Sequence, residues 1–432
     1  MEARLNRLDD RLRAGLLGEA SPLARGLCAA LTLAAFFLLL LTRTFLQTVG
    51  SKVFTALLFL VPLAVMLYVG EQLTKDKLIN VLGICVLCGA AMLARLSFIE
   101  RSAGDYDIYL ADWLQKLASG SFSDGMRANI GEYNVVYQYI LFLITRLPVA
   151  PLYAVKAVSF IGDALLAGAA ARLCGKKPAA FAAALLLPTI VLNGGMFAQC
   201  DSLYAACALW GLAWSLEEKP GRAAVCFALS LAFKLQAVFL LPIVAVLWAD
   251  KKLRLEDALI FVGTLILTAL PAILGGKSIG SILSIYTAQT GLYTDLNYGA
   301  PNFFALMNTQ GLDVYAYGNF AMGLAFGVCA LLVVMGIRRA GQMTRGDYLR
   351  LALLLPLLIV FFLPRMHERY FYLADILGVA LACYDRRMVP AAALIALASL
   401  ASYWEMALPL SLCAGMMLLA AVLVIAGHQK EQ

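Results

Sequence analysis

The sequence predicts an all-α, polytopic membrane protein with about 14 transmembrane or re-entrant helices. Three observations predict this fold class. Of the 432 residues, 62% are hydrophobic and 14% are charged, whereas a soluble domain is about half apolar and a quarter charged. The apolar residues fall in runs of about 20, the length that crosses a bilayer as a helix. Lysine and arginine concentrate in alternate connections between these runs, as cytoplasmic loops require.

Most of the helices are predicted directly from apolar runs. The stretch "GRAAVCFALSLAFKLQAVFLLPIVAVLWADKK" differs, because it is too long for one span and short for two. We expect two short helices there, broken near Lys234, that enter the membrane and return. The runs predicted to be spans are 26–46, 53–70, 78–97, 152–173, 178–193, 202–216, 258–274, 318–337, 349–363, 370–384, 388–403 and 407–426.

Loop charge predicts the orientation of the chain. Residues 1–25 form a basic segment in which leucines recur at helical spacing over 2–17, so we expect a cytoplasmic, interfacial amphipathic helix there. The first span lacks a small-residue cleavage site and is expected to be an uncleaved anchor. A single membrane domain, 26–427, follows, and the tail 428–432 is expected on the cytoplasmic side, as are the basic loops. The predicted outside segments are 98–151 (the main loop, with interfacial helices), 194–201, 275–317 (the second loop), 364–369 and a turn at 404–406.

Composition argues against several functions. The net charge of +7 comes from these loop lysines and arginines, so no nucleic-acid partner is expected. The two histidines, His367 and His428, are too few for a His-based zinc site. The pair Cys85 and Cys88 lies within an apolar run and is expected to pack as small apolar residues.

The polar residues on the predicted outer face are the candidates for chemistry. In "AGDYDIYLADW", Asp105 and Asp107 point in different directions, so one can act as a base while the other binds a hydroxyl or a metal. A solvated acidic loop is the alternative. In "GGMFAQCDS", Gln199 and Asp201 follow a glycine turn, and Asp201 either caps the next helix or faces the site.

Cationic side chains accompany these acids. Lys234 and Gln236 interrupt an apolar stretch. A lysine inside a membrane needs an anionic partner, a carboxylate or a lipid phosphate, unless it reaches the surface. In "PRMHERYFY", the two arginines suit a phosphate, which guanidinium binds in a bidentate manner, although an ordinary charged loop has the same composition. The residues of this segment are Arg365, His367, Glu368 and Arg369.

A second external segment, "GLYTDLNYGAPNFFALMN", mixes aromatic, amide and acidic side chains that suit sugar hydroxyls and sugar faces. Tyr293 and Asn302 are its candidate substrate-binding residues. Its glycine and proline also fit a turn-rich loop without a ligand.

Four strings in this order resemble a known family: "GDYDIYLADW", "MFAQCDSLYAA", "ALSLAFKLQAVFLLP" and "LPRMHERYFYLAD". Together they resemble the GT-C class of membrane glycosyltransferases, most closely the branch of the second mannosyltransferase of glycosylphosphatidylinositol-anchor assembly and its bacterial relatives. The resemblance covers roughly residues 78–385. It implies transfer of mannose or another hexose from a polyprenyl-phosphate carrier to an acceptor hydroxyl on the non-cytoplasmic side, usually with inversion.

The resemblance also implies roles for single residues. Asp105 matches the candidate catalytic base and Asp201 the second acid. Lys234 and Arg369 match the cations that meet the donor phosphate, helped by Arg365 and His367. Two departures stand out: Phe197 and Ala198 replace the family's Trp-Gly, and two extra spans precede the first-loop acid.

These observations predict a hexosyltransferase that needs no cofactor, although a divalent metal bound by Asp105 and Asp107 is an open alternative. Membrane lipid, the polyprenyl-phosphate sugar and a lipid, glycan or protein acceptor are the expected partners. The prenyl chain is expected in a lateral slot lined by 258–274 and 318–337. The rival function is a lipid or sugar-lipid flippase without transfer activity. The absence of half-to-half sequence similarity argues against a transporter.

Overall fold

A computed structural model describes residues 2–42, 49–74, 77–128, 130–131, 133–288, 294–403 and 408–429. This part of the chain contains twenty α-helices and two strands of two residues each, so the predicted all-α class is confirmed. Seven of the described helices are long and apolar enough to cross a membrane, or eight if a bent pair counts as one span. The predicted count of about 14 remains a prediction, because several helices are shorter than a full span.

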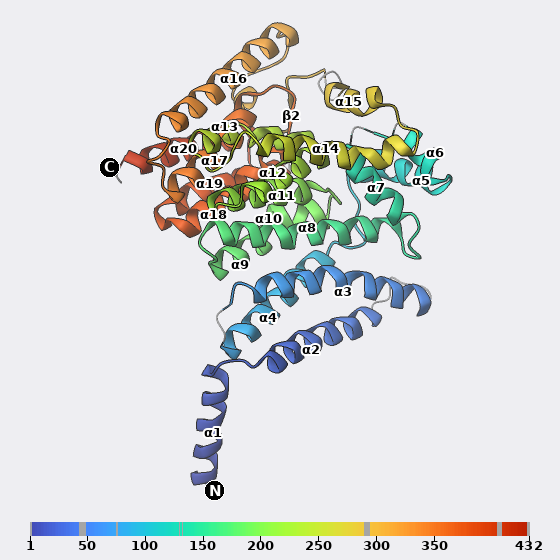
Figure 1. The fold of residues 1–432 in the computed structure, drawn as a ribbon, viewed down its shortest axis with the longest axis vertical. Coiled ribbons are helices and arrows are strands. Elements are labelled where there is room, and N and C mark those ends of the chain that lie inside the picture. The colour runs from blue at the N-terminus through green and yellow to red at the C-terminus, as the bar shows by residue number, and fades with distance from the viewer. Residues whose placement is uncertain are drawn as a thin grey trace.

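The N-terminal helices form a separate layer. Figure 1 shows α2, α3 and α4 lying beneath the rest of the molecule, with α1 set crosswise to them at the N-terminus. The predicted helix over 2–17 is present as α1. Cys85 and Cys88 are buried in α4 and form no disulfide. These elements are α1 (Glu2–Leu17), α2 (Pro22–Leu41), α3 (Val49–Glu71) and α4 (Leu78–Leu96).

The predicted main loop, 98–151, is largely helical. A π-helical turn continues into α5, and two further short helices precede α8. The apolar segment "NVVYQYILFLITRLPVAP" forms only a ten-residue helix, as expected for a stretch too short to span a bilayer. The elements are η1 (Tyr106–Leu110), α5 (Ala111–Ala118), α6 (Phe122–Arg127) and α7 (Val135–Ile144).

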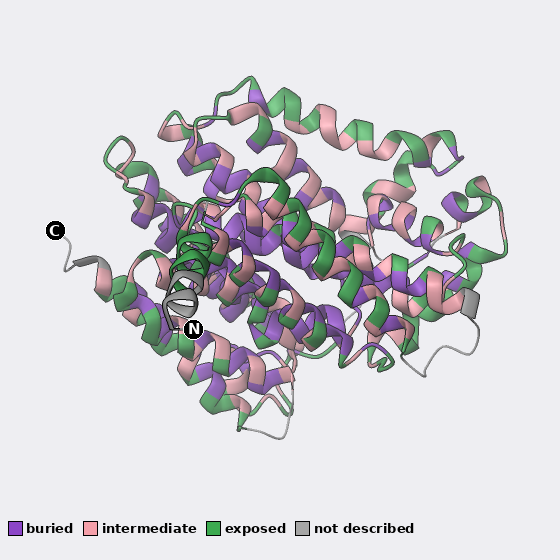
Figure 2. Ribbon diagram, turned by 90° about the horizontal axis from the view of Figure 1, so that it is seen from below, coloured by how far each residue is buried: buried purple, intermediate pink, exposed green. Residues whose placement is uncertain are grey.

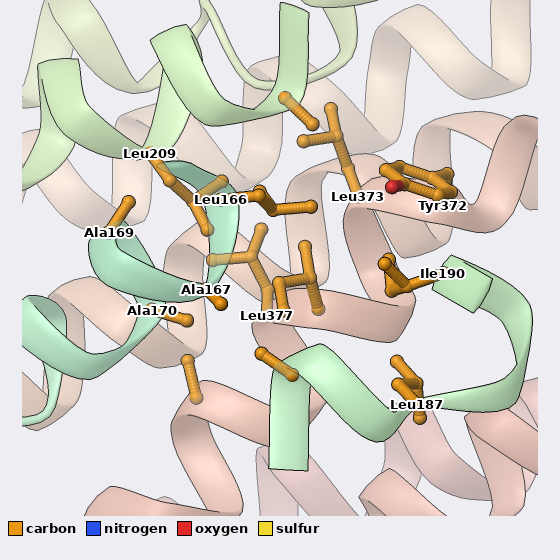
Figure 3. Close-up of a cluster of buried hydrophobic side chains, with 14 of the residues drawn as sticks. Leu166, Ala167, Ala169, Ala170, Leu187, Ile190, Leu209, Tyr372, Leu373 and Leu377 are labelled. Atoms are coloured by element: carbon orange, nitrogen blue, oxygen red, sulfur yellow. The ribbon is translucent and has the colours of Figure 1, made fainter. Parts of the chain in front are cut away.

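The centre of the bundle is built on α8. Its small residues allow close packing: a Cβ added to Gly162 would lie 2.4 Å from Ser202 Oγ in α11. Figure 3 shows Leu166 and Ala170 of α8 facing Leu377 of α18 in the core. The predicted break at Lys234 is confirmed, since α12 ends at Phe233. The elements are α8 (Pro151–Leu173), α9 (Pro178–Leu186), α10 (Pro188–Gly195), α11 (Asp201–Leu216), α12 (Pro220–Phe233), η2 (Leu235–Phe239) and α13 (Ile243–Ala249).

The C-terminal part begins with the peripheral helices α14, α15 and α16 and continues with the largely buried α17 and α18. In Figure 2, buried residues concentrate in the central helices, and the outer helices carry exposed positions along their length. Each of the twelve runs predicted to span contains a helix. The remaining elements are α14 (Asp257–Leu274), α15 (Ile279–Ala288), β1 (Asn297–Tyr298), η3 (Phe303–Leu306), α16 (Val314–Arg338), α17 (Arg345–Phe362), β2 (Met366–His367), η4 (Glu368–Phe371), α18 (Tyr372–Tyr384), η5 (Arg386–Met388), α19 (Val389–Tyr403) and α20 (Leu410–Gln429).

The basic connections meet at one end of the bundle. Arg172 at the end of α8 forms an ion pair with Glu217 after α11, with Nη2 and Oε2 2.7 Å apart. Arg345 at the start of α17 donates to the Arg172 carbonyl at 3.1 Å, and Lys177 donates to the Cys383 carbonyl in α18 at 2.8 Å. The opposite ends of these helices therefore gather the other set of connections, which includes the candidate site.

Candidate active site

The candidate site lies where four segments meet at the end opposite the basic connections. Asp105 precedes η1, and Gly104, at a φ of 57°, lets the chain turn into it. Asp201 is the first residue of α11, and Lys234 occupies the break between α12 and η2. Arg369 lies in the short helix η4 that follows β2. Two ion pairs, together with hydrogen bonds and a ring contact of Gln199 and Tyr133, link all four side chains into one cluster.

The first ion pair joins the early loop to the late one. Arg369 Nη2 lies 2.6 Å from Asp105 Oδ2, and the Arg369 side chain is 12% exposed. Gln199 Nε2 donates to the same oxygen at 3.2 Å. The hydroxyl of Tyr133 donates to Gln199 Oε1 at 3.1 Å. In the described part of the chain, both bonds to the Asp105 carboxylate thus go to Oδ2, which leaves Oδ1 for another donor.

The second ion pair lies deeper. Lys234 Nζ donates to Asp201 Oδ1, and the two side chains are 7% and 3% exposed. Asn193 Nδ2 donates to Asp201 Oδ2 at 2.9 Å and to the Tyr403 hydroxyl at 3.3 Å. A buried lysine needs an anionic partner, and in this structure Asp201 is that partner; contact of Lys234 with a lipid phosphate stays a prediction.

The Tyr133 side chain lies between the two ion pairs. Its hydroxyl bonds to Gln199, which holds Asp105. Its ring centroid lies 5.2 Å from Lys234 Nζ, within cation–π distance. Sequence reasoning missed Tyr133 and Asn193. The only local signal was an asparagine inside an apolar run, next to the two glycines of "LNGG".

A short parallel pairing attaches the second loop to the arginine-rich segment. Asn297 pairs with Met366 and Tyr298 with His367. The rings of Tyr298 and His367 stack with centroids 5.1 Å apart. Arg365 begins this segment with a φ of 63°, in the left-handed region of backbone conformation. A non-glycine residue is strained there, and strain of this kind is common at functional sites.

The predicted substrate-binding residues fall in different places. Gln236 is buried in η2, Glu368 lies beside Arg369 with an Oε1 to Nη1 distance of 3.4 Å, and Asp107 is exposed on η1. Asn302 is fully buried, accepts from the Phe304 N–H and donates to the Leu363 carbonyl. Its amide supports the backbone of η3, so we do not retain it in the site. Tyr293 and the turn at 404–406 lie outside the described residues, as do 430–432 of the tail.

Two cavities flank Lys234 where one slot was expected. One, of about 330 Å³, is lined by α16, Gln236, Arg365 and Tyr370. The other, of about 540 Å³, is lined by α14, α15 and Asn134 beside Tyr133. Both are mostly apolar. Helix α16 borders the first cavity and α14 the second, and neither is lined by both 258–274 and 318–337, so a single slot between them stays a prediction.

Burial shifts the pKa values of two ionisable side chains in the site, His367 and Glu368. Burial, reinforced by the Arg369 guanidinium, lowers the pKa of His367 to about 4, so the imidazole is neutral near pH 7 and can contribute a hydrogen bond, not a positive charge. Burial also raises the pKa of Glu368. Among the described residues, no three His, Cys, Asp or Glu side chains converge as metal ligands. Metal independence remains a prediction.

The depressed pKa of His367 predicts acid-sensitive stability. The unfolded chain protonates His367 near pH 6.5 and the folded chain near pH 4, so stability present above pH 6.5 is lost as the pH falls towards 4. One pKa unit corresponds to about 1.36 kcal/mol, so the expected loss in the free energy of unfolding is about 3 kcal/mol. Thermal melts of the wild type and His367→Gln at pH 7.5 and 4.5 measure it. Glu368 titrates in both proteins, so the difference between their drops in melting temperature reports His367 alone. We expect the smaller drop in the variant. Equal drops would contradict the assignment.

Ala198 is the second strained position in the site. Its φ is 52° and it is 1% exposed, where the resembling family has glycine. Ala198→Gly relieves about 1–2 kcal/mol of strain from the left-handed backbone conformation. Two losses offset this gain: a buried methyl group contributes about 0.8 kcal/mol, and the greater backbone entropy of glycine in the unfolded chain costs about 0.5–1 kcal/mol. We expect Ala198→Gly to be nearly neutral. Ala198→Val, β-branched at positive φ, is expected to lower the melting temperature clearly. An equally stable valine variant would refute this backbone conformation.

No family model and no curated protein sequence matches this chain. The resemblance to GT-C glycosyltransferases therefore stands on the four quoted strings. The structure brings Asp105, Asp201, Lys234 and Arg369 from those four strings into one cluster. The chemistry of that cluster is the basis for a functional proposal.

Proposed function

We propose that this chain is a GT-C-class glycosyltransferase that moves a hexose from a polyprenyl-phosphate carrier to an acceptor hydroxyl. The observation that carries the proposal is the linked pair of ion pairs, Asp105 with Arg369 and Asp201 with Lys234. One acid lies near the surface of the site with a carboxylate oxygen available to an acceptor. Two buried cations lie behind it, within reach of a phosphate.

The donor phosphate would bind at Arg369 and Lys234. The donor is a phosphodiester with one negative charge, and its leaving group is a phosphate monoester that gains a second. Preorganised cations stabilise such developing charge in a site of low dielectric. The three carboxylates and three cations of the site have no net formal charge in the free protein (Asp105, Asp201, Glu368; Lys234, Arg365, Arg369). Burial raises the pKa of Glu368, which lessens the negative charge that opposes a bound anion.

Asp105 would act as the base. Arg369 pairs with it in the free protein, and a bound phosphate competes for the same guanidinium. The loosened Asp105 carboxylate then accepts the proton of the acceptor hydroxyl as its oxygen attacks the anomeric carbon. The bond from that carbon to the phosphate oxygen breaks, and its electron pair leaves with the phosphate. One displacement of this kind inverts the anomeric configuration. Placement contributes more than basicity here, because a carboxylate is a weak base.

The two cavities give the substrates separate approaches. The cavity beside α16 touches Gln236, Arg365 and Tyr370 next to the phosphate-binding cations, so the prenyl chain of the donor is assigned to it. Asn134, the neighbour of Tyr133 in the chain, forms part of the wall of the α14 cavity. The acceptor would reach Asp105 from that side.

Loop charge supports the orientation of this proposal. The basic connections gather at one end of the bundle and the site at the other. By the positive-inside rule the basic end, with both termini, is cytoplasmic. The site is then on the non-cytoplasmic side of a membrane domain with about 14 transmembrane or re-entrant helices.

The test is transfer of label in detergent. Purified protein is incubated with polyprenyl phosphates carrying labelled mannose, glucose, galactose or arabinose and with a membrane extract as acceptor. We expect label to leave the donor lipid for a product. The rival function, a flippase, predicts movement of labelled lipid across liposomes and no transfer with any of the four donors. That result would overturn the proposal.

A further inference from the structure

One face of α8 contacts the segments that carry the two parts of the candidate site, Asp105 and the Gln199–Asp201 turn. Lys156, Ser159 and Asp163 are spaced by three and four residues, so they lie on the same side of the helix. All three side chains are buried. Lys156 and Asp163 bond to the segment that leads to Asp105, and Ser159 bonds to the turn that carries Gln199. None of the three belongs to the cluster of ion pairs.

Lys156 holds the segment that leads to Asp105. Its ammonium donates to the carbonyls of Phe98 at 2.7 Å and Ile99 at 3.0 Å, and also to the carbonyl of Arg101. The three donors of an ammonium are thereby used on three backbone acceptors within four residues. The clamped segment ends four residues before Asp105, so its position sets where the base begins.

The next two residues of this face hold the turn that carries Gln199 and the end of α4. Ser159 Oγ donates to the Gln199 carbonyl at 2.6 Å, and Ser202 Oγ donates to the Ser159 carbonyl at 2.9 Å. Asp163 Oδ2 lies 2.8 Å from Arg95 Nε at the end of α4, with both side chains fully buried. The turn that carries Gln199 and the helix that leads to Asp105 are thus attached to adjacent turns of α8.

We infer that this face of α8 fixes the distance between Asp105 and the Gln199–Asp201 turn, and that Lys156 is a positioning residue for the base. The inference rests on the proposed function only in naming Asp105 as the base. A buried lysine bound to carbonyls alone is costly in a membrane protein, and an apolar side chain would pack there without that cost. Its three directed bonds provide what packing does not: a fixed path for the backbone before Asp105.

A matched pair of variants separates positioning from general stability. Lys277 is also buried and also donates to backbone, to the carbonyls of Met126 at 3.2 Å and Ala128 at 3.3 Å, away from Asp105. Lys156→Met and Lys277→Met each remove such an ammonium. We expect Lys156→Met to lower kcat about 100-fold, the effect of misplacing a catalytic group by about 1 Å, with the donor KM unchanged. Lys277→Met is expected to lose stability without losing kcat.

A second readout does not depend on transfer. Release of the Arg101 carbonyl exposes the following peptide bond, so trypsin is expected to cut after Arg101 faster in Lys156→Met than in the wild type or in Lys277→Met, as measured by mass spectrometry of the new N-terminus. If Lys156→Met does not fold, Lys156→Gln, with two donors, is expected to show the same changes to a smaller degree. Unchanged cleavage and unchanged kcat would overturn the inference. If Lys156→Met is cleaved faster than the wild type but the wild type transfers no sugar, the result counts against the proposed function and not against this inference.

Discussion

Asp105→Asn is expected to lower the rate of sugar transfer by about 10²–10⁴-fold, the usual contribution of a general base. The amide keeps the size of the side chain and can still bond to Gln199, but it cannot accept the proton of the acceptor hydroxyl. The measurement is the initial rate of label transfer at saturating donor. Donor binding is expected to persist, because the phosphate is assigned to Arg369 and Lys234.

The control for this variant is Asp112→Asn. Asp112 lies in the same predicted loop, is exposed, and pairs with Lys116 one helical turn away at 2.6 Å. An exposed pair of this kind contributes little to stability, and its removal is expected to leave transfer unchanged. Full activity in Asp105→Asn, or an equal loss in both variants, would remove Asp105 as the base.

Lys234→Met is expected to weaken donor binding and to reduce transfer by about 10²–10³-fold, the range for loss of one preorganised donor to a developing oxyanion. It also leaves the buried Asp201 without its ion-pair partner, which costs about 3–5 kcal/mol of stability. Donor affinity and the melting temperature in detergent measure the two effects. Lys277→Met, which removes a buried ammonium without breaking an ion pair, is the control for both.

A double variant separates the two effects of Lys234. Asp201→Asn combined with Lys234→Met removes both charges, so no uncompensated carboxylate remains, and most of the lost stability is expected to return. Transfer and donor binding are expected to stay low, because only Arg369, and no longer Lys234, faces the phosphate. If the double variant binds donor like the wild type, Lys234 serves only to neutralise Asp201 and has no role towards the substrate.

Sequence alone predicted the elements of the fold more fully than their contacts. Every run predicted to span contains a helix, because a long apolar stretch flanked by charge has few other stable forms in lipid. The break at Lys234 was predictable for a related reason, since a lysine inside an apolar run needs an anionic partner. Which anion it pairs with was not predictable: Asp201 and Lys234 lie in different segments with no local pattern that links them.

The architecture around the site depended on contacts between distant segments. The pairing of Tyr298 with His367 involves two-residue strands, too short to leave a period in the sequence. Tyr133 reads as an ordinary loop aromatic, although it connects Gln199 with Lys234. The two apolar helices expected to line one lipid slot border separate cavities, which their composition alone does not reveal.

The central claim is that one hollow at the non-cytoplasmic end of the bundle places an acid of the early loop opposite cations of later segments to transfer a sugar. An experimental structure with a non-transferable polyprenyl-phosphonate sugar tests it most directly. We predict the phosphonate against Arg369 and Lys234, the prenyl chain along α16, and the anomeric carbon facing Asp105. A sugar headgroup bound at the basic end, or with Asp105 out of reach of its anomeric carbon, would contradict the account.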